Sequence, residues 1–159
     1  MAKEEGRKIV IVSASIGTGH MQAARAIEEY WHQVEPDATI THVDFLDTDT
    51  LSIDNLLKVT YIKMIDVFPM LYDLIYRLST GAKKGAVMQT ALSYLLKSRM
   101  YKLIKKSQPD VMIFTHPFPL GAACILKRRG LIDVPLMAIM TDFSSHQFWI
   151  YPQVDSYFV

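Results

Sequence analysis

Apolar residues along the chain alternate between short continuous runs and segments of helical periodicity. The continuous runs predict five buried strands, at residues 8–14, 39–45, 110–115, 136–141 and 155–159. After the first strand, apolar positions between 23 and 34 recur every three or four residues, which predicts a helix that is broken at Pro36. Strands that alternate with helices predict an α/β fold with a doubly wound, mostly parallel, Rossmann-like sheet.

About sixty residues separate the second predicted strand from the third, which is more than one crossover helix needs. Residues 51–78 are rich in apolar and aromatic side chains and contain Pro69, so we predict two helices there, the second beginning near the proline. Two glycines predict a loop at 81–85, and a further amphipathic helix is predicted at 86–106. This region would form a helical layer inserted between the second and third strands.

The composition restricts the class of protein. The chain has 159 residues, of which 50% are hydrophobic and 21% charged, so we expect one globular domain and not a disordered or fibrous chain. The single cysteine excludes an internal disulfide framework and a multi-cysteine zinc site, and it indicates a reducing cytoplasm. The longest stretches without charged residues, 9–24 and 111–126, have sixteen residues each. A spanning helix needs roughly 20 apolar residues, so no transmembrane helix is predicted.

Charge is distributed unevenly along the chain. Residues 77–129 hold eleven basic residues and one acid, whereas residues 1–50 hold four basic residues and nine acids. Basic residues beside apolar helices are typical of a surface that binds anionic lipid, although a solvated face is the plainer interpretation. No recognition helix, zinc site or RNA-stacking motif accompanies them, so no nucleic-acid partner is expected. The basic residues expected at an anionic membrane are Lys83, Lys84, Lys97, Arg99, Lys102, Lys105 and Lys106.

Polar residues follow three of the predicted strands, at the edge where an open parallel sheet binds its ligands. His20 follows the first strand, His116 the third, and Asp142 and His146 the fourth. We expect them to converge. His20 would begin a helix, where the helix dipole disfavours imidazolium, so a neutral imidazole acting as general base is predicted. Asp142 is interpreted as a base or as an orienter of a histidine, while capping and turn-forming roles remain open for these residues.

The loop between the first strand and its helix is rich in glycine. Gly17, Thr18 and Gly19 could let the backbone approach a phosphate closely at the start of a helix. The dinucleotide-binding fingerprint requires a third glycine where this chain has Gln22. Asp44 nevertheless stands near the place of a ribose-binding acid, so a dinucleotide-binding oxidoreductase domain remains an alternative.

A stiff segment follows the third strand. Pro117 and Pro119 fix the backbone after Thr115 and His116, which suits the wall of a pocket and equally a strand-to-helix turn. Trp149 could line the mouth of the site, although such a residue more often lies in the core. Two further histidines lie within a predicted helix and a predicted strand and are given structural roles: His32 and His42.

Three segments together resemble the amino-terminal domain of the diacylglycerol glycosyltransferases, the family of the plant monogalactosyldiacylglycerol synthases and the bacterial processive diacylglycerol β-glucosyltransferases. The first is Ser-Ala-Ser-Ile-Gly-Thr-Gly-His-Met-Gln-Ala-Ala at 13–24, and the second runs from Gln-Pro-Asp at 108 to Pro119. The third is Met-Thr-Asp-Phe at 140–143 with His146, Trp149 and Val-Asp at 154–155. The resemblance covers essentially the whole chain in order, although many relatives have Gly-Asn-Gly-His or Gly-Gly-Gly-His where this chain has Gly-Thr-Gly-His.

The resemblance implies a two-domain GT-B architecture. Residues 1–159 would be the acceptor-binding, membrane-facing half, and a UDP-sugar-binding domain would lie outside this chain. The last predicted strand has no helix after it to cover it, which also leads us to expect a further domain. Without that domain, residues 1–159 alone are not expected to have catalytic activity.

The reaction implied by the resemblance is inverting transfer of a hexose from UDP-sugar to diacylglycerol at the cytoplasmic face of the cell membrane. His20 would receive the acceptor's proton or contact an anionic headgroup. UDP-sugar is a donor substrate, and no cofactor or metal is expected. A non-catalytic module that binds anionic lipid is a further alternative. The residues expected to bind substrate are Gly17, Thr18, Gly19, Thr115, His116, Pro117, His146 and Trp149.

Overall fold

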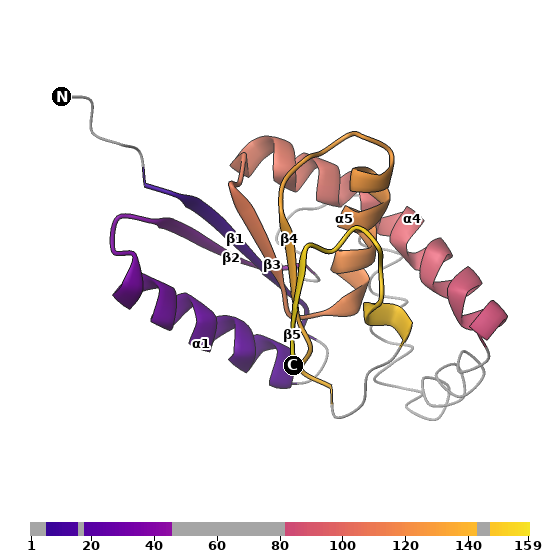
Figure 1. The fold of residues 1–159 in the computed structure, drawn as a ribbon, viewed down its shortest axis with the longest axis horizontal. Helices are drawn as coiled ribbons and strands as arrows, with labels where there is room; N and C mark the ends of the chain where they lie inside the picture. Colours follow the sequence, from indigo (N-terminus) through magenta and orange to yellow (C-terminus); the bar gives the residue numbers. More distant parts are fainter. Residues whose placement is uncertain (1–5, 16–17, 46–81, 143–146) are drawn as a thin grey trace.

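The computed structural model describes residues 6–15, 18–45, 82–142 and 147–159. Its five strands form one parallel sheet in the order β2-β1-β3-β4-β5 (Figure 1). The strands are β1 (Lys8–Ser13), β2 (Thr39–Asp44), β3 (Val111–Phe114), β4 (Leu136–Ile139) and β5 (Ser156–Phe158). The predicted Rossmann-like α/β fold and all five predicted strands are therefore confirmed.

Helices cover both faces of this sheet, as Figure 1 shows. One face carries α1 (Gly19–Val34), and the other carries α4 (Ala82–Ser107) and α5 (Pro117–Arg128), with the short 3-10 helix η1 (Gln147–Trp149) beside them. Because crossovers between parallel strands are right-handed, the helices change face where the strand order reverses, between β1 and β3. A reversal of this kind opens a crevice at the carboxyl ends of the strands, where ligands bind.

The core consists of two apolar layers, one on each face of the sheet. In β1, Ile9 and Ile11 pack toward α1, while Val10 and Val12 pack toward α4 and α5. Successive side chains of a strand point to opposite faces, so a strand covered on both sides reads as a continuous apolar run. Helix α5 is the most enclosed helix among the described residues, since every residue from Pro117 to Leu126 is buried.

The predicted amphipathic faces of α4 are confirmed. Met100 and Ile104 are buried, and Leu96 and Leu103 pack against the core. The lysines of the opposite side are exposed: Lys102, Lys105 and Lys106. None of the helices described here is both long and apolar enough to cross a membrane.

The loop predicted at 81–85 is wrong from Ala82 onward, because α4 begins there and includes Gly85. A single glycine costs only about 1 kcal/mol in a helix interior. Alanine, lysine and methionine, which are good helix formers, surround this one and offset that cost. The two helices predicted between 51 and 78, and Pro69, lie outside the described residues.

Candidate active site

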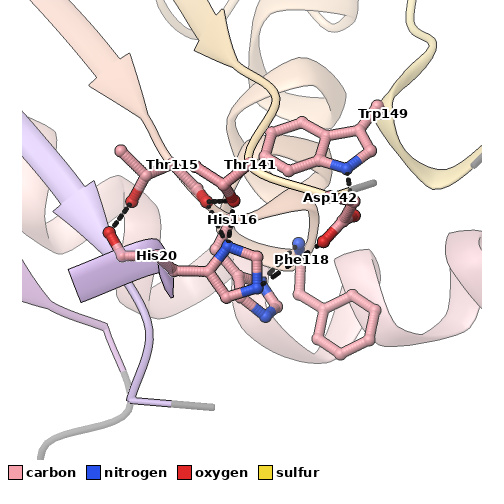
Figure 2. A network of polar contacts seen from close by, with 7 residues as sticks. All are labelled: His20, Thr115, His116, Phe118, Thr141, Asp142 and Trp149. Carbon is pink, nitrogen blue, oxygen red and sulfur yellow. Dashed lines mark hydrogen bonds and ion pairs between the residues drawn. The ribbon is translucent and has the colours of Figure 1, made fainter. Parts of the chain in front are cut away.

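A reciprocal pair of hydrogen bonds joins the first turn of α1 to the end of β3. Thr115 is fully buried, and its hydroxyl donates to the backbone carbonyl of His20 at 2.9 Å. The carbonyl of Thr115 in turn lies 2.7 Å from His20 Nδ1 (Figure 2). A carbonyl can only accept, so Nδ1 carries the proton and donates it. When the imidazole is neutral, its Nε2 therefore has a free lone pair.

Thr141, just beyond β4, adds a third strand end to this arrangement. Its Oγ1 lies 2.5 Å from His20 Nδ1 and donates to the carbonyl of Thr115 at 3.3 Å. Side chains and backbone from α1, β3 and β4 therefore fix the orientation of one imidazole ring. Thr141 belongs to the third segment of the family resemblance but is not among the predicted site residues. The usable signal was a threonine directly before the candidate residue at two strand ends, as in Thr115-His116 and Thr141-Asp142.

Asp142 lies on the other side of the His20 ring. Its Oδ1 is 3.9 Å from Nε2, which is too long for a hydrogen bond but close enough for a carboxylate to attract a protonated imidazole. Nε2 itself makes no hydrogen bond with any residue that the structure describes. The Thr115 carbonyl, and not Asp142, occupies the orienting position at Nδ1.

Trp149 determines how Asp142 lies. The indole is fully buried, as the core interpretation predicted, and its Nε1–H donates to Asp142 Oδ2 at 2.7 Å. The Asp142 side chain is 38% exposed, so the carboxylate stands at the surface while its orientation is set from the core. Figure 2 shows this bond and the imidazole of His20 on opposite sides of the carboxylate.

His116 lies directly beside His20 in the structure. The two ring centroids are 4.5 Å apart in an edge-to-face arrangement. His116 is also the N-cap of α5, because its Nδ1 accepts the N–H of Phe118 at 3.2 Å, with Pro117 at the first helical position. Burial and the neighbouring His20 lower the pKa of His116 to about 3. The ring is therefore neutral at physiological pH, with its proton on Nε2.

The start of α1 is open. Thr18 is its N-cap but makes no side-chain capping bond. A Cβ added at Gly19 would meet nothing within 4 Å. An uncapped first turn presents backbone N–H groups and the positive end of the helix dipole, which together suit an anion. Of the other predicted site residues, Pro117 is buried in α5, and Gly17 and His146 lie outside the described residues.

The basic residues are divided between two environments. Lys97 lies 4.8 Å from the ring centre of Tyr94, which also receives a 2.8 Å hydrogen bond from Arg129. That bond and the Arg129 charge lower the pKa of Tyr94. Arg99 instead lies over the ring of the buried Phe45, at 5.1 Å. Lys83 and Lys84 lie in α4, but their side chains are outside the described part of the structure.

No group of three His, Cys, Asp or Glu side chains among the described residues could hold a metal ion. The site consists of an oriented imidazole with one free nitrogen, a carboxylate beside that nitrogen, and an uncapped helix start. Such a site can accept a proton from a bound hydroxyl and attract an anion. The site lies at the strand-order reversal of a Rossmann-like α/β domain, the place where sheets of this type bind their ligands.

Residues 20–159 match the family model of monogalactosyldiacylglycerol (MGDG) synthase. The chain is 31% identical to the processive diacylglycerol β-glucosyltransferase of Bacillus cytotoxicus and 32% identical to that of Bacillus cereus strain 03BB102. Each comparison covers 154 residues, which are 96% of this chain and 38% of the relative. The chain therefore belongs to the monogalactosyldiacylglycerol synthase family of diacylglycerol glycosyltransferases, as its resemblance predicted. It spans 38% of the length of these curated relatives.

Proposed function

We propose that the full-length protein transfers a hexose from UDP-sugar to diacylglycerol with inversion, and that residues 1–159 form the acceptor-binding half of a GT-B enzyme. The observation that carries this proposal is the hydrogen bonding of the His20 imidazole. Its Nδ1–H is bound to the Thr115 carbonyl, and its Nε2 makes no hydrogen bond with the described residues. A neutral imidazole held in this way is a general base at the edge where the acceptor would bind.

The proposed step is a single displacement. The acceptor hydroxyl gives its proton to Nε2 of His20 as its oxygen bonds to the anomeric carbon. The bond from that carbon to the UDP oxygen breaks, and UDP leaves with the electron pair. Asp142, 3.9 Å from Nε2, stabilises the imidazolium that forms. A positioned base typically contributes 10²–10⁴-fold to such a reaction.

The leaving group needs stabilisation as negative charge develops on UDP. The uncapped start of α1 and the open space at Gly19 suit close approach of the donor phosphates. Most donor contacts are assigned to a second domain. If His20 contacts an anionic headgroup instead of the reacting hydroxyl, its loss would change the dependence on anionic lipid and leave kcat at saturating lipid unchanged.

The proposed membrane contact is the basic side of α4 and the end of α5. Lys102, Lys105 and Lys106 of α4 are exposed, as are Arg128 and Arg129 at the end of α5. Two apolar residues of α4 and of the chain just beyond α5 are also exposed: Leu95 and Leu131. Each basic side chain near an anionic leaflet contributes about 1 kcal/mol, so a few of them hold the protein at the cytoplasmic membrane surface.

The oxidoreductase alternative is less well supported. Asp44, its proposed ribose-binding acid, accepts the backbone N–H of Ser15 at 3.1 Å and is already engaged within the chain. The family to which the chain belongs is one of glycosyltransferases.

The test is an assay of the full-length protein with diacylglycerol vesicles that contain anionic lipid, and with UDP-glucose and UDP-galactose offered separately. We expect a glycosyldiacylglycerol with a β linkage, released together with one UDP per sugar transferred. An α-linked product would contradict inversion. Tight binding of NADH without sugar transfer from either donor would overturn the proposed function in favour of the oxidoreductase alternative.

A further inference from the structure

A second polar cluster lies outside the active site, between β1, β2 and α1. Ser13 Oγ is 2.8 Å from His42 Nε2, and His42 Nδ1 is 3.5 Å from Glu28 Oε2. The order of serine, histidine and acid is that of a nucleophilic triad. Ser13 has no exposed surface, however, and therefore meets no substrate. The position of the cluster between β1, β2 and α1 indicates a different role.

Ser13 and Met21 stand on either side of the loop that leads to His20. Ser13 is the last residue of β1, and Met21 follows His20 in the first turn of α1. The Ser13 hydroxyl contacts Met21 Sδ at 3.0 Å as well as the imidazole of His42. One buried hydroxyl therefore joins the two ends of the loop, and His42 holds that hydroxyl in place.

The same strand holds the loop at a second point. Asp44 lies two residues after His42, so the two side chains point to the same face of β2. Asp44 Oδ1 accepts the backbone N–H of Ser15, inside the loop, at 3.1 Å. His42 also reaches α1 through Glu28, eight residues beyond His20. The carboxyl end of β2 thus contacts the strand before the loop, the loop itself and the helix after it.

We propose that His42 and Asp44 are positioning residues, which fix Ser13, Ser15 and the first turn of α1 so that His20 keeps its place against Thr115. The inference rests on the proposed function, because it concerns the residue assigned there as the base. Neither residue touches the reacting atoms in this assignment. A displacement of about 1 Å at a catalytic group can cost on the order of 10²-fold in rate, so a loop held less firmly lowers kcat.

The test compares His42→Ala and His42→Gln in the full-length protein, with His32→Ala as the matched control. The glutamine amide can reach the position of Nε2 and keep the bond to Ser13. His32 is exposed on α1 and outside the cluster. We expect His42→Ala to lower kcat by about 10- to 100-fold with little change in KM for either substrate. His42→Gln should recover most of that loss, and His32→Ala should behave as the wild type.

A second readout does not depend on sugar transfer. In protein labelled with ¹⁵N-histidine, the Nδ1–H of His20 should give a slowly exchanging NMR signal because it is bound to the Thr115 carbonyl. His42→Ala should speed its exchange or abolish the signal. If the wild type forms no glycolipid, the proposed function fails, and this signal still decides whether His42 positions His20.

Asp44 provides an independent test if His42→Ala does not fold. Asp44→Ala removes the acceptor of the Ser15 N–H, whereas Asp44→Asn keeps an oxygen at that place. We expect a lower kcat and faster exchange of the His20 signal in the alanine variant, with recovery in the asparagine variant. Variants that lower the melting temperature but keep the kcat and the His20 signal of the wild type would overturn the proposal and leave the cluster a purely structural role.

Discussion

At the scale of single residues, the proposed base depends on groups that lie inside the protein. Thr115 and Trp149 have no exposed surface, yet the first orients His20 and the second orients Asp142. The Thr115 carbonyl oxygen and the Trp149 Nε1–H form hydrogen bonds with these two partners. Removing one such atom therefore tests the orientation of the site, and a matched substitution elsewhere in the protein controls for the side-chain volume that is lost.

Trp149→Phe is the sharpest of these changes. Phenylalanine keeps an aromatic ring in the core but cannot donate to Asp142 Oδ2. A hydrogen bond to a charged group contributes about 1.5–3 kcal/mol, so we expect kcat to fall roughly 10- to 100-fold. The matched control is Trp31→Phe, since Trp31 Nε1–H donates to Glu35 on α1, away from the site. Equal activity of the two variants would contradict the role given to Trp149.

His116 gives a prediction of pH dependence. Its folded pKa of about 3 lies below the ordinary value of 6.5, because burial and His20 oppose its protonation. As the pH falls below 6.5, the unfolded chain takes up this proton and the folded chain does not. The free energy of unfolding should therefore fall by up to about 1.4 kcal/mol per pH unit between pH 6.5 and 3 from this residue alone.

His116→Asn isolates that contribution. Asparagine can still accept the Phe118 N–H as a helix cap, but it does not titrate. The free energy of unfolding, measured with urea between pH 4 and 7, should depend less steeply on pH in the variant than in the wild type. The difference in slope should correspond to about one proton fewer taken up on unfolding. Parallel curves would mean that His116 is not held neutral in the folded protein.

At the scale of elements, α4 and α5 approach each other closely through a glycine. A Cβ at Gly121 of α5 would lie closer than 3.0 Å to both Ser93 Oγ of α4 and Tyr151 Oη. Real Cβ contacts are not this short, so Gly121→Ala must displace both of these groups. We expect the free energy of unfolding to fall by about 1–3 kcal/mol, as measured by urea denaturation. Gly19→Ala, where the added methyl meets nothing, should cause no comparable loss.

Elements were predictable from the sequence where burial is continuous. The apolar run of β1 is covered on both faces, and such strands stand out without alternation. The sequence does not predict the beginning of α4, because two glycines indicate a loop at 81–85, whereas one glycine within a helix of twenty-six residues is a small cost. The sequence indicates Thr141 only by its place before Asp142 at a strand end, and its distance to His20 depends on how β3 and β4 pair.

Among the histidines, too, the sequence predicts some positions and misses other contacts. The rule for parallel sheets predicts that His20 and His116 lie at one edge, and the structure brings their rings together. His42 was given a structural role, and nothing in its local sequence indicates that Ser13 and Glu28 would meet its two nitrogens. These contacts arise from the pairing of β2 with β1 and from the packing of α1 against the sheet.

At the scale of the whole molecule, the proposed basic side of α4 and α5 gives a prediction about membranes. The full-length protein should sediment with vesicles that contain anionic lipid, and less so as salt rises. Lys102→Glu should weaken this binding roughly fivefold or more, since each basic side chain contributes about 1 kcal/mol. Arg25→Glu, an exposed site on α1, should not. Binding that does not depend on anionic lipid or on salt would contradict the proposed electrostatic contact.

The central claim is that His20 accepts the proton of the sugar acceptor, and the kcat of His20→Ala in the full-length protein tests it most directly. We predict a loss of about 10²–10⁴-fold, with partial recovery when imidazole is added to occupy the vacated space and accept the proton. A kcat within about twofold of the wild type, against the minimum 10²-fold effect expected of a positioned base, would contradict the claim.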